Sequence, residues 1–181
     1  MDNPSRSFII IFNCFPWLLV CMPRQLRAMI DTNVYALLYK SGIEKISKMI
    51  EAGNLVVFGC RIIRKELRAI PPHIKEDGKS YRNSLLEAYD KLAGKHDVPV
   101  AELSQELAKQ YVKEYAGGTS RYKIYSDFLI VATATIHGLD LIVTEDEKTM
   151  KSGLAKIAYG KENEKNGLTT PVFVELEKLP L

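Results

Sequence analysis

Short runs of apolar and β-branched residues alternate along the chain with longer amphipathic stretches. The short runs predict strands at residues 26–30, 55–58, 96–100, 139–143 and 172–176, and Pro99 favours an edge position for the third. The stretches between them predict helices at residues 34–39, 43–52, 61–70, 79–93, 101–116 and 126–137. Because strands separated by helices pair in parallel through right-handed crossovers, we predict a three-layer α/β/α sandwich with a mainly parallel central sheet.

A hydrophobic segment precedes this alternation. Residues 8–21 read FIIIFNCFPWLLVC, a run interrupted by Pro16 and shorter than the roughly 17–25 residues that a membrane-spanning helix needs. Its length is that of the apolar region of a signal peptide, and Leu18 to Cys21 form a loose lipobox. We interpret residues 1–21 as an extension outside the fold, with an added edge strand and a targeting segment as alternatives. Residues 22–181 are then one domain.

Composition narrows the class of protein. A chain of 181 residues with 46% hydrophobic and 26% charged residues is typical of a globular domain, which excludes disordered, collagenous and coiled-coil chains. The net charge of +3 permits a nucleic-acid partner but does not argue for one. The cysteines, Cys14, Cys21 and Cys60, form no C-x-x-C pair, which excludes a zinc knuckle or a redox dithiol. Sparse cysteine favours a reducing compartment, so we expect a cytoplasmic protein.

Four carboxylates stand at or near the ends of predicted elements. Asp31 follows the first strand, and Asp146 comes three residues after the strand that ends at residue 143. Glu66 interrupts the apolar stripe of the helix at 61–70, and Asp127 opens the helix at 126–137. Each has a structural alternative: a turn residue at Asp31, a helix cap at Asp146, the edge of the stripe at Glu66, and helix-dipole compensation at Asp127.

Convergence of these carboxylates would demand a cation. Ligand sites of parallel sheets lie beyond the carboxyl ends of the strands, where Asp31 and Asp146 are expected. Two carboxylates about 4 Å apart repel each other by roughly 4 kcal/mol at an effective dielectric constant near 20. Oxygen ligands without His or Cys favour Mg²⁺ or Mn²⁺ over zinc, and a water on such an ion can attack a phosphodiester.

In order and spacing, the motifs of this chain resemble those of a PIN domain, over a span from about Met22 to Leu176. They are MIDTNV at residues 29–34, Glu66, SDFLIVATA at 126–134 and LIVTED at 141–146. The resemblance implies a metal-dependent ribonuclease in which the candidate ligands of Mg²⁺ or Mn²⁺ are Asp31, Glu66, Asp127 and Asp146. It also implies supporting roles for Thr32, Asn33, Ser126 and Thr144. Many members are toxins of type II toxin–antitoxin modules (VapC-type), which implies a small antitoxin partner and a homodimer.

Basic residues provide candidate contacts for single-stranded RNA. A helical stripe is predicted from Arg61, Arg64, Lys65 and Arg68, and a loop before Asp127 carries Arg121 and Lys123 beside two tyrosines, Tyr122 and Tyr125. Phosphate contacts together with aromatic stacking suit an unpaired RNA strand. The alternative is that these residues form solvated faces and a hinge after Gly117-Gly118.

Thr149 leaves a second function open. Members of the resembled family often carry a further acidic residue at this position, so the alternative is a catalytically weak or inactive module that binds RNA or protein, for example in RNA processing. A phosphoaspartate phosphatase is the other rival class, and Asn33 argues strongly against it, because the motif needs an Asp at this position. The zinc ribbon of the Nob-like ribosomal nucleases is excluded by the lack of a Cys pair.

Overall fold

A parallel sheet forms the centre of the molecule. The computed structural model describes residues 24–41 and 43–179, and the predicted extension at residues 1–21 lies outside this range. Within it, five strands pair in parallel in the order β5-β2-β1-β6-β7. They are β1 (Leu26–Ile30), β2 (Leu55–Cys60), β5 (Asp97–Val98), β6 (Leu141–Val143) and β7 (Val172–Val174). The short β5 lies at an edge next to Pro99, as its proline predicted.

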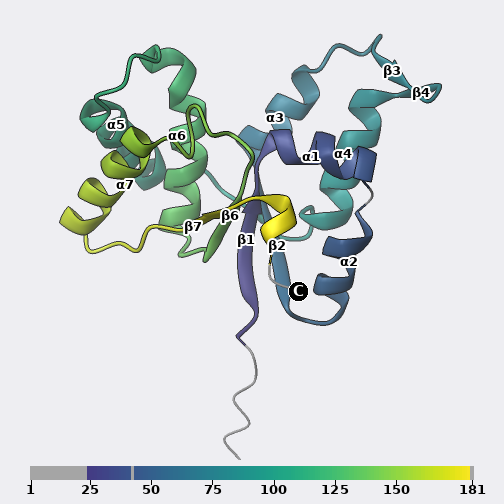
Figure 1. Ribbon diagram of the computed structural model, residues 1–181, viewed down its shortest axis with the longest axis horizontal. Helices are drawn as coiled ribbons and strands as arrows, with labels where there is room; N and C mark the ends of the chain where they lie inside the picture. Colours follow the sequence, from purple (N-terminus) through teal and green to yellow (C-terminus); the bar gives the residue numbers. More distant parts are fainter. Residues whose placement is uncertain (1–23, 42, 180–181) are drawn as a thin grey trace, which may run out of the picture.

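Helices cover both faces of this sheet. Figure 1 shows one group on one side, namely α5 (Glu102–Glu114), α6 (Arg121–Ile136) and α7 (Gly153–Lys165). The other side carries α1 (Thr32–Ser41), α2 (Glu44–Glu51) and α4 (Tyr81–Leu92), and α3 (Arg61–Ala69) packs against α1, α4 and α6. The predicted three-layer sandwich is therefore confirmed. No helix of the described residues is both long and apolar enough to cross a membrane.

Helix α6 begins five residues earlier than the sequence pattern predicts. The pattern places its start at Ser126, whereas the helix starts at Arg121. The first turn carries the exposed side chains of Arg121, Tyr122 and Lys123, and this polarity resembles a loop. The prediction that Asp127 opens the helix is therefore wrong, because Asp127 lies in the second turn.

Two further elements were not predicted. Residues 75–80 form a small hairpin, β3 (Lys75–Glu76) and β4 (Lys79–Ser80), which takes the place of the first residues of the predicted helix at 79–93. Its turn residues Asp77 and Gly78 have φ values of 51° and 76°, the left-handed conformation that two-residue hairpins need. Helix α7 has only a weak amphipathic pattern, and its N-terminus is capped by the Ser152 hydroxyl, which accepts the Ala155 N–H at 3.2 Å.

The strand order creates a switch point between β1 and β6. From β1 the chain continues to β2 and β5 on one side, while β6 and β7 lie on the other. Ile30 is paired with Val143, and the Asp31 N–H donates to the Val143 carbonyl at 2.9 Å. The carboxyl ends of β1 and β6 therefore lie side by side, at the place where open α/β sheets bind ligands.

Candidate active site

Asp31 is held at the end of β1 from two sides. The Thr144 hydroxyl donates to Asp31 Oδ2 at 2.8 Å, and the Thr32 N–H donates to Oδ1 at 2.7 Å. Asp31 is only 6% exposed, and chiefly this burial raises its pKa to about 6. The charges of Glu66 and Asp146 also raise the pKa, whereas the two hydrogen bonds act to lower it. A buried carboxylate in this position is stabilised by a proton or by a cation.

Glu66 joins this end of the sheet through Thr32. Helix α3 follows β2 directly, and its half-buried Glu66 accepts a hydrogen bond from the Thr32 hydroxyl at 2.5 Å. Thr32 thus contacts Asp31 with its backbone and Glu66 with its side chain. The side-chain amide of Asn33 donates from Nδ2 to Thr144 Oγ1 at 3.4 Å, and its Oδ1 accepts the Glu145 N–H at 3.4 Å. Asn33 therefore links the segments that follow β1 and β6.

Asp146 is fixed by the loop that follows β6. Its Oδ1 accepts the N–H groups of Lys148 at 2.9 Å and Thr149 at 3.0 Å, and its Oδ2 accepts that of Met150 at 3.1 Å. Burial acts to raise the pKa of Asp146, but hydrogen bonds from the Thr149 hydroxyl and from these backbone groups outweigh it and lower the pKa below its usual value. Asp146 does not cap the following helix, because the N-cap of α7 is Ser152. Its contacts instead close the turn at residues 147–150, and they favour the ionised carboxylate.

Asp127 meets Asp146 through the hydroxyl of Thr149. Thr149 Oγ1 lies 2.7 Å from Asp127 Oδ2 and also contacts Asp146 Oδ2. A hydroxyl carries one proton, so it can donate to only one of two ionised carboxylates. Burial, together with the charges of Asp31, Asp146 and Glu66, raises the pKa of Asp127 to about 7 even though Thr149 opposes this. Because Asp127 lies beyond the first helical turn, dipole compensation does not account for it.

The four candidate carboxylates are therefore connected by three threonines. Thr32 links Asp31 to Glu66, and Thr149 links Asp127 to Asp146. Thr144, which the resemblance associated with Asp146, donates to Asp31 and accepts the Asp146 N–H at 3.1 Å. The carboxylates come from four different elements and converge on one end of the sheet.

The donor set suits a hydrated ion of the Mg²⁺ type. Among the described residues no three Asp, Glu, His or Cys side chains are arranged as a ready-made metal centre. Mg²⁺ is usually bound through one or two carboxylates and keeps several waters, so it does not require such a cage. All four candidate groups offer oxygen. Burial, with a smaller contribution from neighbouring carboxylates, raises the pKa of Asp31 and that of Asp127, so a cation at this place would favour their ionised forms. Residues with these properties fit Mg²⁺ or Mn²⁺ and not zinc.

The predicted basic stripe on α3 is present, but its members differ in their partners. Arg64 pairs with Asp90 of α4 through both guanidinium nitrogens and lies over the Tyr89 ring, 5.4 Å from its centroid. Arg61 and Lys65 line a groove of about 370 Å³ between α3 and α6, together with Glu66 and with the supporting candidate Ser126. Arg68 is exposed and lines, with the other three basic residues, a smaller hollow on the outer side of α3.

Arg121 and Lys123 do not belong to a loop as predicted. Both are exposed in the first turn of α6, where a cation is disfavoured by the helix dipole. Their neighbour Tyr122 is 92% exposed, whereas Tyr125, one turn further along, lines the groove between α3 and α6. The two tyrosines therefore differ sharply in their surroundings.

Two residues that shape the candidate site were not identified from the sequence. Thr149 was considered only as a missing acid, although its spacing of three residues from Asp146 is typical of side chains that cap a turn. Lys151, 6% exposed, forms ion pairs with Glu147 at 2.6 Å and with Glu175 at 3.1 Å, and so ties the loop of Asp146 to the residue after β7. Nothing in the local pattern around Lys151 indicates that it is buried.

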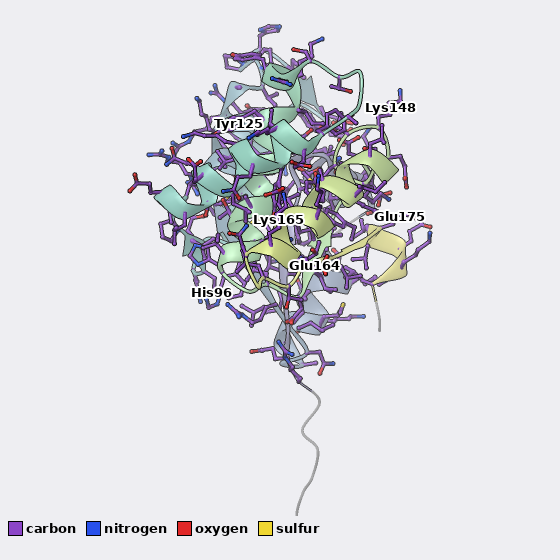
Figure 2. The ribbon with its side chains drawn as sticks, turned by 90° about the vertical axis from the view of Figure 1, so that its left-hand side faces the viewer. His96, Tyr125, Lys148, Glu164, Lys165 and Glu175 are labelled. Carbon is purple, nitrogen blue, oxygen red and sulfur yellow. The ribbon has the colours of Figure 1, made fainter. Side chains whose placement is uncertain are left out.

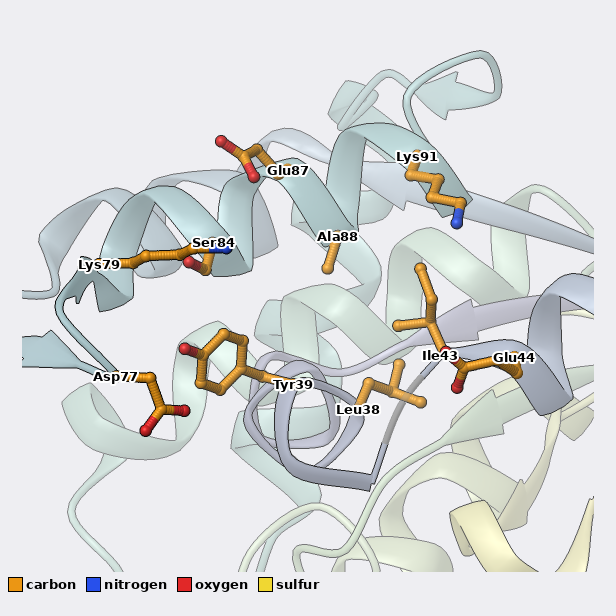
Figure 3. Close-up of a pocket in the computed structure, with 10 residues that line it drawn as sticks. All are labelled: Leu38, Tyr39, Ile43, Glu44, Asp77, Lys79, Ser84, Glu87, Ala88 and Lys91. Carbon is orange, nitrogen blue, oxygen red and sulfur yellow. The ribbon is translucent and has the colours of Figure 1, made fainter.

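A separate hollow lies away from the carboxylates. It has a volume of about 490 Å³ and opens between α1 and α4, with Tyr39, Asp77 and Lys79 among its lining side chains (Figure 3). None of the predicted site residues lines it. The candidate active site is therefore the end of the sheet at β1 and β6, bordered by the groove between α3 and α6.

The chain belongs to the PIN domain family. The family's sequence model matches residues 28–152, a span that includes all four candidate carboxylates. The family predicted from the motifs is thus confirmed. A comparison with curated protein sequences finds no match.

Three solved structures are similar to this chain at low sequence identity. VapBC2 from Rickettsia felis, bound to a DNA fragment from its promoter, is 13% identical with a TM-score of 0.50, over 83% of this chain and 98% of that chain. FitAB bound to an IR36 DNA fragment is 14% identical with a TM-score of 0.49, over 85% and 98% of the two chains. FitAcB from Neisseria gonorrhoeae is 19% identical with a TM-score of 0.49, over 81% and 96%.

Proposed function

We propose that this PIN domain, over residues 22–181, is a divalent-metal-dependent endoribonuclease that hydrolyses phosphodiester bonds of single-stranded RNA. PIN domains are in general nucleases that use divalent metal ions, which supports the proposal. The observation that carries it is the convergence of Asp31, Glu66, Asp127 and Asp146 at the switch point of the sheet. Burial and neighbouring carboxylates raise the pKa of Asp31 and that of Asp127, so a bound cation would favour the ionised form of both groups.

The four carboxylates have two tasks in the proposed mechanism. They would hold Mg²⁺ or Mn²⁺, which when bound supplies an acidified water and neutralises charge on the phosphate. Asp31 is restrained at both oxygens, which suits a group that must keep a fixed position. Glu66 and Asp127, each hydrogen-bonded to a threonine through Oε2 or Oδ2, would orient the attacking water.

Substitution tests the assignment of these residues. The purified protein should cut a labelled single-stranded RNA with Mn²⁺ or Mg²⁺, and cutting should stop in EDTA. Asp31→Asn, Glu66→Gln and Asp127→Asn should each lower kcat/KM by at least about a hundredfold while the circular dichroism spectrum is retained. Cleavage that survives both EDTA and Asp31→Asn would contradict the proposal, and normal turnover in one variant would remove that residue from the site.

A toxin role belongs to the same proposal. The fold likeness to VapBC2, whose crystal structure holds promoter DNA, is consistent with a toxin that has an antitoxin partner. The resemblance to VapC-type toxins further implies that this partner is small and that the protein is a homodimer. Induced expression should arrest growth, and co-expression of a short protein from the adjacent reading frame should relieve the arrest. Growth arrest by the Asp31→Asn variant would contradict a toxin that acts by cleavage.

A non-catalytic binding module is the second candidate. It is favoured by Thr149, which supplies a hydroxyl where many relatives supply a carboxylate. Such a module would bind single-stranded RNA with similar affinity in Mg²⁺ and in EDTA, and would leave the RNA intact at high protein concentration. Cleavage that depends on metal and on Asp31 excludes it.

A further inference from the structure

The groove between α3 and α6 begins beside one of the candidate carboxylates. Glu66 contributes to its wall, and the same wall carries Arg61 and Lys65, which are four residues apart and therefore lie on one side of α3. Tyr125 and Leu129 line the opposite wall from α6, again four residues apart. In Figure 2, Tyr125 lies toward the same end of the molecule as Lys148 of the Asp146 loop, and His96 lies toward the opposite end.

The two walls differ in chemistry. The α6 wall presents the half-buried Tyr125 ring and Leu129, and Ile62 adds apolar surface from α3. The α3 wall presents two exposed cations, Arg61 and Lys65, for which no ion pair is found in residues 24–41 and 43–179. An aromatic ring with apolar neighbours, facing these two cations, matches a nucleotide, whose base stacks and whose phosphate is anionic.

We propose that this groove binds the nucleotide next to the scissile phosphate of single-stranded RNA, with its base stacked on Tyr125 and its phosphate held by Arg61 and Lys65. The proposal rests on the proposed function, because the carboxylate of Glu66 connects the groove to the candidate active site. The bases of a duplex are already stacked on one another, so the groove selects an unpaired strand. Tyr125 is the residue that sets this preference.

The chain offers a matched control for each contact. Tyr122 lies one turn before Tyr125 on α6, is 92% exposed and does not line the groove. Arg64 adjoins Lys65 on α3, but its guanidinium is paired with Asp90. Substitution of either control residue changes the same side-chain type on the same helix without touching the groove.

Binding can be measured apart from cleavage. The protein is the full chain with Asp31→Asn, and the probe is a fluorescein-labelled eight-nucleotide single-stranded RNA in Mg²⁺, followed by fluorescence anisotropy. Tyr125→Ala should weaken Kd by about tenfold, whereas Tyr125→Phe and Tyr122→Ala should leave it within about twofold. Lys65→Gln and Arg61→Gln should weaken binding and lower the salt dependence by about one unit each, and Arg64→Gln should not.

A second measurement reports stacking itself. An RNA with 2-aminopurine should lose fluorescence on binding to the parent protein, and this loss should disappear with Tyr125→Leu, which keeps apolar bulk but has no ring. Equal effects of Tyr122→Ala and Tyr125→Ala, or unchanged quenching with Tyr125→Leu, would overturn the groove assignment. If the wild-type protein binds RNA through the groove but cuts no RNA, the groove proposal stands and the nuclease proposal is refuted. If the protein cuts RNA in a metal-dependent way that Tyr125 substitutions do not affect, the nuclease proposal stands and the groove proposal is refuted.

Discussion

The hydroxyl of Thr149 lies 2.7 Å from Oδ2 of Asp127, although the two residues are 22 positions apart and belong to the loop after β6 and to helix α6. The same hydroxyl contacts Asp146, so one side chain connects two candidate metal ligands. The resemblance to PIN domains made this position notable for a missing carboxylate. The structure assigns it a different task, because Thr149 orients the carboxylates that are present.

The first prediction concerns this hydroxyl. Thr149→Val keeps the shape of the side chain but removes the donor, so Asp127 and Asp146 lose a shared contact. Removing a group that orients metal ligands typically lowers activity by about 10–100-fold, and we expect a loss of kcat/KM in this range. Thr149→Ser, which keeps the hydroxyl, is the control and should retain most of the activity. Equal activity of the Val and Ser variants would show that the contact is dispensable.

A carboxylate at the same position should strengthen metal binding. Thr149→Asp adds a fifth acid to the cluster, and affinity for a hard cation rises with the number of charged oxygen ligands. We expect Mn²⁺ affinity, measured by isothermal titration calorimetry, to increase by about tenfold. Thr149→Asn introduces a side chain of nearly the size of Asp but without its charge, so it should not increase the Mn²⁺ affinity. Weaker Mn²⁺ binding in the Asp variant would place Thr149 outside the metal site.

The stability of the metal-free protein should fall as the pH rises from 5 to 8. Burial and neighbouring charges raise the pKa of Asp127 to about 7 and that of Asp31 to about 6, from an ordinary value of 3.8. The folded state therefore holds these protons more tightly than the unfolded chain, and this stabilisation is lost as each carboxyl ionises. Thermal unfolding in EDTA should show a Tm several degrees higher at pH 5 than at pH 8.

Asp127→Asn should remove much of this pH dependence. The amide cannot ionise, so at pH 8 the variant should melt about 5 °C above the wild type in EDTA, while it loses activity. Glu164→Gln changes an exposed carboxylate for which no ion pair is found in residues 24–41 and 43–179. It is the control and should leave the pH profile unchanged. A wild-type Tm that rises between pH 5 and pH 8 would contradict the assigned pKa shifts.

Metal binding should restore the thermal stability that is lost when Asp31 and Asp127 ionise. At pH 8, Mg²⁺ or Mn²⁺ at about a hundred times its Kd stabilises a protein that binds it only when folded by roughly 2.7 kcal/mol. We expect a Tm increase of several degrees, followed by differential scanning fluorimetry and reversed by EDTA. Asp31→Asn should abolish the increase. A shift that persists in this variant would indicate that the ion binds elsewhere.

Local patterns were enough to locate most elements and every candidate acid. Residues 26–30 were predicted as a strand with the bounds that β1 has, because this mostly apolar run ends at Asp31. The start of α6 was misplaced, because Arg121 to Lys123 are exposed and polar and show no apolar period. Helix α7 was missed because its charged residues and two glycines weaken the helical pattern.

The amino-acid sequence by itself determined the alternation of most strands and helices, the family, and the presence of four acids on separate segments of the chain. Only the tertiary structure decided which groups meet: Thr149 with Asp127, Arg64 with Asp90, and Tyr125 with the wall that carries Lys65. Periodicity reports which face of an element is buried, but it does not report what lies opposite that face. The partner of each side chain depends on the crossovers that bring distant segments together, and those contacts arise when the sheet and its helices pack.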